Sequence, residues 1–116
     1  MSAHAAAWTD LCAADALRPE TARRVDLGGR TYAVFRGLDD GYYCSDGLCP
    51  HEAAHLARGT VSGTRVECPR HGLRFDLASG RRRGLPACPD LMVYPVRLRH
   101  GRVEALIPKD DPAPAQ

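Results

Sequence analysis

The sequence predicts an all-β fold, a sandwich or a small barrel of antiparallel strands. Many short segments alternate apolar and polar residues, glycine-rich turns separate them at regular spacing, and no segment has the apolar periodicity of a long helix. The chain has 116 residues, of which 44% are hydrophobic and 26% charged, values close to those of an ordinary globular domain. We therefore expect one compact domain.

The predicted strands follow one another with only short connections. A two-glycine turn at Gly28-Gly29 joins the first pair as a hairpin, and the segment 13–21 is expected to hold one helical turn at most. In the segment 92–98, alternation would place Met92, Tyr94, Val96 and Leu98 on one face. The predicted strands are residues 24–27, 31–35, 42–44, 60–61, 65–67, 74–77, 92–98 and 103–107.

The charge balance restricts the class of function. Sixteen basic and fourteen acidic residues give a formal charge of +2, too close to neutrality for a protein that binds nucleic acid by neutralising many phosphates. The N-terminus lacks the pattern of a signal peptide, and no apolar run is long enough to span a membrane. A cytoplasmic protein is therefore expected, and in that reducing compartment five cysteines favour metal binding or free thiols over disulfides.

Two loops interrupt the strand pattern, and each contains a cysteine and a histidine. They read Cys49-Pro50-His51 and Cys68-Pro69-Arg70-His71, with sixteen residues between His51 and Cys68. A chance occurrence of both pairs, each with a proline after its cysteine, has a probability on the order of 10⁻⁴. Two thiolates and two imidazoles suit either a tetrahedral zinc ion or a two-iron cluster. Zinc modules usually pair like with like, so the mixed loops favour a cluster in which one iron takes both thiolates and the other both imidazoles.

These residues resemble the Rieske-type ferredoxins, which carry C-x-H and C-x₂-H separated by about fifteen to seventeen residues. The resemblance covers roughly residues 8–108. The segment 52–55 departs from it, because it lacks the glycine common in the family's first loop. Further matches to the family pattern are Leu56, Gly59, Gly72, Phe75, Asp76, Ser79-Gly80, Pro86-Ala87, Leu91 and Tyr94-Pro95-Val96.

The resemblance implies a Rieske domain at residues 8–108, an antiparallel β-sandwich with an inserted cluster-binding subdomain at about residues 47–89. Residues 1–7 and 109–116 would be flexible ends. It also implies one [2Fe-2S] cluster held by Cys49, His51, Cys68 and His71.

The function implied is that of a soluble electron carrier rather than an enzyme. It would be a monomer that takes one electron from a flavin-dependent reductase and passes it to a terminal oxygenase, such as an aromatic ring-hydroxylating dioxygenase or a multicomponent monooxygenase. The alternatives are a zinc-binding interaction domain and a Rieske-like small subunit of nitrite reductase. A Rieske oxygenase would need a second iron site, for which the five histidines leave no credible set.

The resemblance also predicts the reduction potential. Respiratory Rieske proteins have a disulfide across the cluster and two hydroxyl donors near its sulfurs, at positions that correspond here to Ala54 with Arg70, and to Leu73 with Phe75. Without these groups the reduced cluster loses stabilisation, so we expect a potential at the low end of the range of this class.

The other candidate residues have simpler interpretations. Cys12 and Cys44 are expected to be small buried hydrophobic residues, Cys88 a thiol packed in the proline loop, and His55 a surface histidine rather than a ligand. Tyr94 and Phe75 are expected to belong to the core. The run Arg81-Arg82-Arg83 is interpreted as a solvated stretch of charge, with a docking rim for an acidic partner as the alternative.

Overall fold

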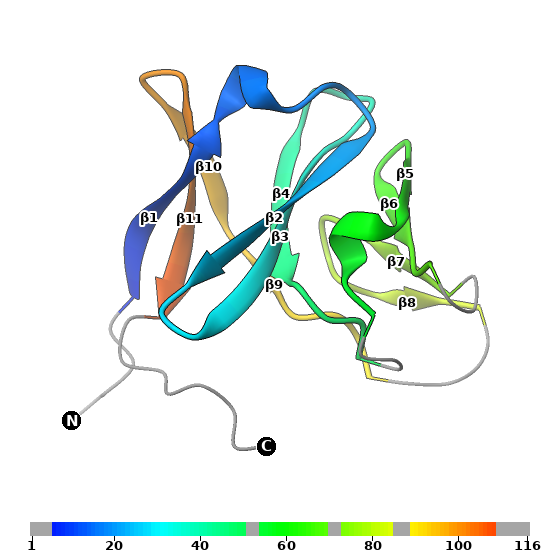
Figure 1. Cartoon of the computed structure of the whole chain (residues 1–116). Helices are drawn as coiled ribbons and strands as arrows, with labels where there is room; N and C mark the ends of the chain where they lie inside the picture. Colours follow the sequence, from blue (N-terminus) through cyan, green and yellow to red (C-terminus); the bar gives the residue numbers. More distant parts are fainter. Residues whose placement is uncertain (1–5, 51–53, 70–72, 85–88, 109–116) are drawn as a thin grey trace.

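The computed structural model describes residues 6–50, 54–69, 73–84 and 89–108. Strands dominate these residues, and they form a larger and a smaller lobe, seen at the left and the right of Figure 1. Their helical segments are two single 3₁₀ turns, η1 (Ala14–Ala16) and η2 (Leu56–Arg58). The single helical turn predicted in the segment 13–21 is thereby confirmed. No helix among the described residues is long and apolar enough to cross a membrane.

The strands form three sheets in which every pairing is antiparallel. Two of the sheets, β1-β11-β10 and β2-β3-β4-β9, build the larger lobe, and the third, β5-β6-β7-β8, belongs to the smaller one. The strands are β1 (Ala6–Ala13), β2 (Thr21–Leu27), β3 (Arg30–Arg36), β4 (Tyr42–Asp46), β5 (Thr60–Ser62), β6 (Arg65–Glu67), β7 (Arg74–Asp76), β8 (Arg82–Arg83), β9 (Val93–Tyr94), β10 (Val96–Arg99) and β11 (Arg102–Pro108).

The predicted all-β class and its inserted subdomain are confirmed. The smaller lobe interrupts the chain between β4 and β9, which pair directly with each other in the larger lobe. The predicted hairpin is also present: β2 and β3 pair from Thr21 with Arg36 to Leu27 with Arg30, across the turn at Gly28-Gly29. Both glycines have positive φ, 55° and 82°, which explains why this turn requires them.

Two features of the larger lobe differ from the sequence prediction. β1 was not predicted; it begins at Ala6, inside the segment expected to be a flexible end, and pairs with β11 from Ala6 opposite Pro108. The single strand predicted at 92–98 is wrong, because the chain leaves one sheet after Tyr94 and enters the other at Val96. Pro95 stands at the break, where its missing N–H removes a ladder bond. The expected common face is lost, and Met92 and Leu98 are exposed.

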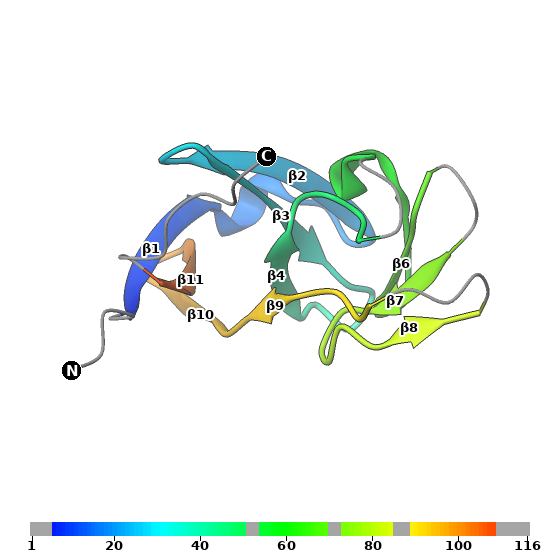
Figure 2. The ribbon, with the colours of Figure 1, turned by 90° about the horizontal axis from the view of Figure 1, so that it is seen from below.

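The buried apolar side chains form three groups. Two lie in the larger lobe, around Val34 and Val103 and around Tyr32 and Ile107. The third joins the lobes, because Ala33 and Phe35 of β3 pack against residues of the smaller lobe. Figure 2 shows β9 between β10 and the smaller lobe. The segment through which the chain returns from the smaller to the larger lobe therefore also lies along this junction.

Candidate metal centre

Two loops of the smaller lobe are closed in the same way by a cysteine backbone. The N–H of Cys49 donates to the carbonyl of Ala54 at 2.9 Å, and the N–H of Cys68 donates to the carbonyl of Leu73 at 2.7 Å. Cys49 follows β4, and Cys68 lies between β6 and β7. Each bond spans the segment that contains the histidine of its motif, so the two motifs occupy two short, closed loops.

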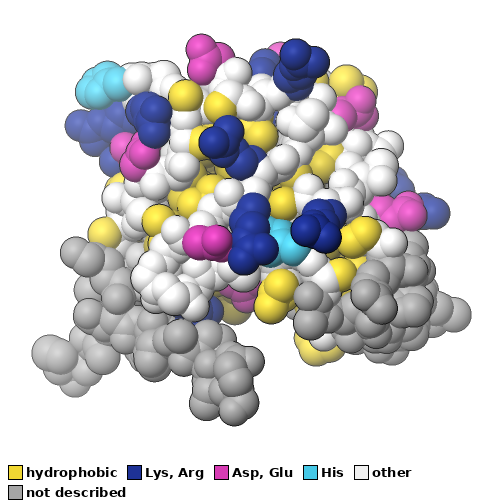
Figure 3. All heavy atoms as spheres, in the orientation of Figure 1, with side chains coloured by type: hydrophobic (Ala, Val, Ile, Leu, Met, Phe, Trp, Pro, Cys, Tyr) yellow, Lys and Arg dark blue, Asp and Glu magenta, His cyan; other side chains and the backbone are white. Residues whose placement is uncertain are grey.

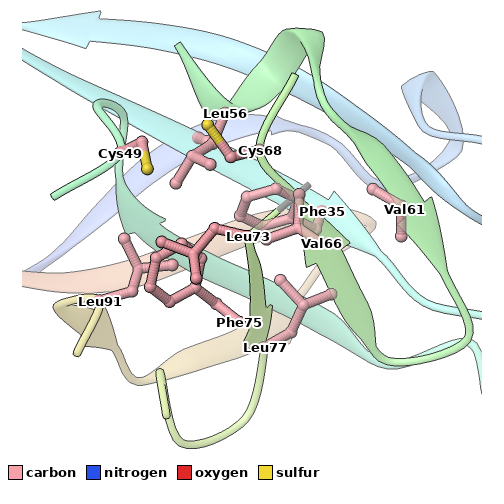
Figure 4. Close-up of a cluster of buried hydrophobic side chains, with 11 residues drawn as sticks. Phe35, Cys49, Leu56, Val61, Val66, Cys68, Leu73, Phe75, Leu77 and Leu91 are labelled. Atoms are coloured by element: carbon pink, nitrogen blue, oxygen red, sulfur yellow. The ribbon is translucent and has the colours of Figure 1, made fainter. Parts of the chain in front are cut away.

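The two cysteines lie in one cluster of buried side chains. Cys49 is 4% exposed and Cys68 is 2% exposed, and neither takes part in a disulfide bond. Figure 4 shows them on the same side of the cluster, with Leu73, Phe75 and Leu91 below them in that view. The fold therefore places the cysteines of the two motifs in one buried group.

The histidines of the two motifs, His51 and His71, lie outside the described residues. Within the described ranges, no three histidine, cysteine, aspartate or glutamate side chains gather as a metal site. The cysteines are thus the part of the predicted ligand set that the structure places. Arg70, Gly72, Pro86, Ala87 and Cys88 also lie outside the described residues.

The surroundings of the cysteines fit a low-charge metal cluster. Leu56, Leu73 and Phe75 are fully buried beside them, and Leu91 is 3% exposed. A lone thiolate in such an apolar place is costly, whereas thiolates bound to iron share their charge with the metal. A [2Fe-2S] cluster with two thiolate and two neutral imidazole ligands is close to neutral when oxidised, which suits these side chains.

Two glycines of the family pattern leave room for this packing. A Cβ on Gly59 would collide with the carbonyl oxygen of Glu67, and a Cβ on Gly80 would collide with the carbonyl oxygen of Leu91. Gly80 also has a φ of 78°, which an L side chain rarely adopts. Its carbonyl accepts the N–H of Leu91 at 2.8 Å, and this bond fixes Leu91 in the shared cluster.

His55 is not the surface histidine that the sequence predicted. It is 8% exposed, its Nε2 lies 2.8 Å from Oγ1 of Thr31, and its Nδ1 accepts the N–H of Ala57 at 3.1 Å. The ring thus closes the start of η2 and reaches β3 of the larger lobe. Sequence reasoning missed this role, because the contact with Thr31, 24 residues away, leaves no local signal.

The remaining predicted residues take the expected places where the structure describes them. Cys12 and Cys44 are 6% and 1% exposed, and burial raises the pKa of Cys44 to about 12, so this thiol stays protonated. Phe75 is fully buried. Tyr94 is half-buried, its hydroxyl donates to Asp46, and its ring meets Tyr32 edge-on at 5.5 Å.

Comparison with known proteins identifies the family. The sequence family described as Rieske [2Fe-2S] domain matches residues 7–95. Ferredoxin CarAc of Metapseudomonas resinovorans is 36% identical over 97 residues, which cover 83% of this chain and 90% of that protein.

Solved structures agree with this match. A chain from the complex of reduced oxygenase and oxidized ferredoxin in carbazole 1,9a-dioxygenase is 34% identical, with a TM-score of 0.78 over 85% of this chain and 92% of that one. A putative NADH-dependent nitrite reductase small subunit from Mycobacterium tuberculosis is 28% identical, with a TM-score of 0.76 over 87% of this chain and 95% of that one. The chain belongs to the Rieske [2Fe-2S] domain family and carries one Rieske-type [2Fe-2S] cluster.

Proposed function

We propose that this protein is the ferredoxin component of a multicomponent oxygenase system, and that it carries one electron at a time from a reductase to a terminal oxygenase. The observation that carries the proposal is the pair of closed loops that bring Cys49 and Cys68 into one buried cluster. The similarity to a carbazole dioxygenase ferredoxin supports an aromatic ring-hydroxylating dioxygenase as the acceptor.

The proposed ligands are Cys49 and Cys68 on one iron, and His51 and His71 on the other. When bound, the cluster supplies a one-electron couple with no bond to substrate. The chain's own part is to close each loop through the backbone hydrogen bond of its cysteine and to pack both cysteines in one buried cluster. Leu73, Phe75 and Leu91 exclude water from the side of the cysteines that faces the core.

The proposed limits of the domain are residues 8–108, extended at the N-terminal side to Ala6, where β1 begins, with the cluster-binding subdomain at about 47–89. The strand pair formed by β1 and β11 supports treating both ends of this range as part of one fold. We propose that the protein works as a monomer in the cytoplasm, where the reducing environment keeps cysteine ligands available for iron.

A flavin-dependent reductase is the proposed donor, because a flavin can accept one hydride, which carries two electrons, and release these electrons one at a time. No catalytic role is proposed for the chain itself. A Rieske oxygenase needs two histidines and a carboxylate around a further iron, and the five histidines of the sequence leave no credible set for such a site.

A small subunit of nitrite reductase is the second candidate, on the strength of the similar solved structure. The two candidates differ in the cluster that they require. The sequence retains both C-x-H and C-x₂-H motifs in full, which favours a redox carrier over a subunit without a complete ligand set.

Purification without added metal tests the proposal. We expect a brown protein with iron and acid-labile sulfide in equal amounts, which becomes EPR-active when dithionite adds one electron per chain. The variants Cys49→Ala and Cys68→Ala should lose the colour. The variant Cys12→Ala, in the buried group around Val34 and Val103, should keep it. A colourless protein that holds zinc and no sulfide would overturn the proposal.

A further inference from the structure

The formal charge of the chain is unevenly distributed along the sequence. Residues 47–89 contain seven arginines and three carboxylates, a formal charge of +4, while the rest of the chain contains nine basic and eleven acidic residues, −2. Figure 3 shows one face of the molecule, on which basic and acidic side chains are interspersed. The positive excess therefore belongs to the part of the chain that contains the cysteine loops.

The strand register gathers this charge on one face of the small sheet. Val61, Val66 and Phe75 are buried, so the residues that alternate with them face outward. Arg65 and Arg74 lie on this outer face, and Arg83 stands directly opposite Arg74 on the next strand. Arg81 precedes β8 and is exposed as well. We call these four residues, Arg65, Arg74, Arg81 and Arg83, the arginine face.

The carboxylates near the arginine face are already engaged. Glu67 forms an ion pair with Arg74 at 3.4 Å, and Asp76 accepts both the N–H and the hydroxyl of Ser79. Asp90 accepts the N–H of Arg82 at 2.9 Å. These local bonds hold turns and strand ends in place, and three carboxylates do not balance the arginines around them.

Two arginines directly opposite each other on neighbouring strands reduce the stability of a sheet. The pair Arg74 and Arg83 is such an arrangement. Beside it, Arg81, Arg82 and Arg83 line a surface hollow of about 410 Å³ together with Asp90. A hollow lined by three arginines and one engaged carboxylate has room for an anionic side chain from outside.

We propose that the arginine face is the docking surface for an acidic patch on a protein redox partner. The inference rests on the proposed function, because a docked partner must come close to the cluster to exchange an electron. The opposite side of the same sheet supplies Phe75 to the buried group that contains Cys49 and Cys68. Complementary charge would thus orient the partner toward the lobe that holds the cluster and raise the rate of encounter.

Small redox probes of opposite charge test this surface without an identified partner. The dithionite-reduced protein is mixed in a stopped-flow instrument with ferricyanide, an anion, or with tris(phenanthroline)cobalt(III), a cation. In each reaction the protein loses one electron and the probe gains it, with no proton or bond transferred. The variant R81E/R83E is compared with R18E/R99E, which makes the same change in net charge at two exposed arginines outside residues 47–89.

At an ionic strength of about 10 mM we expect R81E/R83E to react about tenfold more slowly with ferricyanide and faster with the cobalt cation. R18E/R99E should change both rates much less, and the difference should vanish at about 0.5 M salt. Equal effects of the two variants, or no effect of R81E/R83E, would overturn the docking surface. A protein that accepts and returns no electron would instead contradict the proposed function.

A competition experiment identifies the kind of partner. At low salt, poly-L-glutamate should slow the ferricyanide reaction of the native protein and should not slow that of R81E/R83E. A DNA oligonucleotide of equal charge is the comparison. If DNA slowed the reaction at a lower concentration than polyglutamate, or if polyglutamate did not slow it at all, the result would contradict an acidic protein partner.

Discussion

Nε2 of His55 lies 2.8 Å from Oγ1 of Thr31, and this contact connects the first cysteine loop to strand β3 of the larger lobe. Because Nδ1 of the same ring accepts the N–H of Ala57, the proton of the neutral imidazole is on Nε2, which donates to Thr31. A β-bridge between Leu48 and His55 adds a second connection beside Cys49. His55 therefore fixes the end of the loop that begins at Cys49.

Substitutions at His55 should separate the contributions of the two hydrogen bonds that its ring forms. His55→Gln can still reach Thr31, His55→Asn can still accept the N–H of Ala57, and His55→Ala can do neither. We expect each amide variant to lower the free energy of unfolding by about 1 kcal/mol and the alanine variant by about 2 to 3 kcal/mol. Urea unfolding of the cluster-loaded protein measures this. His100→Asn, at an exposed turn, is the control, and an equal loss there would contradict the assignment.

The same residue predicts a pH dependence. Burial holds the pKa of His55 below its usual 6.5; Arg24 and Arg58 act in the same direction, and Asp26 opposes them. The unfolded chain then binds this proton at a higher pH than the folded chain, so the contribution of His55 to stability is complete above about pH 6.5 and decreases below it. The difference in unfolding free energy between the native protein and His55→Gln should therefore shrink between pH 7.5 and 5. A constant difference would contradict this.

His55 also shows where sequence reasoning reaches its limit. Local rules were sufficient for the hairpin at Gly28-Gly29, because turn chemistry and alternation act within a few residues. They failed at Pro95, where one alternating segment is divided between two sheets by tertiary packing. They also failed at His55, whose burial depends on Thr31, a residue from another strand.

The candidate site was more predictable than the details of the fold. Cys49 and Cys68 could be selected as ligands from among the five cysteines, because a metal site imposes a spacing between cysteine and histidine that packing alone does not. Their common burial with Leu73 could not be derived from spacing, because it depends on how the smaller lobe folds against Phe35 of β3. The arginine face required the strand register, which places Arg74 opposite Arg83.

The buried apolar residues beside the cysteines predict a low reduction potential. Leu73 and Phe75 are fully buried in the group that contains both cysteines, and neither side chain can donate a hydrogen bond to a sulfur atom. We expect a midpoint potential below about +100 mV. Phe75→Tyr should raise it by on the order of 50 mV, because one added hydrogen bond is worth about 1 kcal/mol in a one-electron couple. Redox titration followed in the visible spectrum measures both values, with Phe35→Tyr as the matched control.

Substitution of Gly80 tests how much its close contact with Leu91 contributes to stability. A Cβ at this position would collide with the carbonyl oxygen of Leu91, at a φ of 78° that already disfavours a side chain. Gly101 has a similar φ of 74°, but among the described residues no atom lies within 4 Å of its added Cβ. Gly101→Ala should therefore cost about 1 kcal/mol, for the backbone strain alone.

Gly80→Ala should cost about 3 kcal/mol or more, because the strain and the collision add. It should also speed the loss of the cluster absorbance at 25 °C, since a displaced Leu91 would open the buried group around Cys49 and Cys68 to water. Denaturant unfolding and the bleaching half-life of both variants measure the two effects. Equal losses of stability in Gly80→Ala and Gly101→Ala would show that the contact with Leu91 does not constrain this position, and that φ alone selects glycine at both turns.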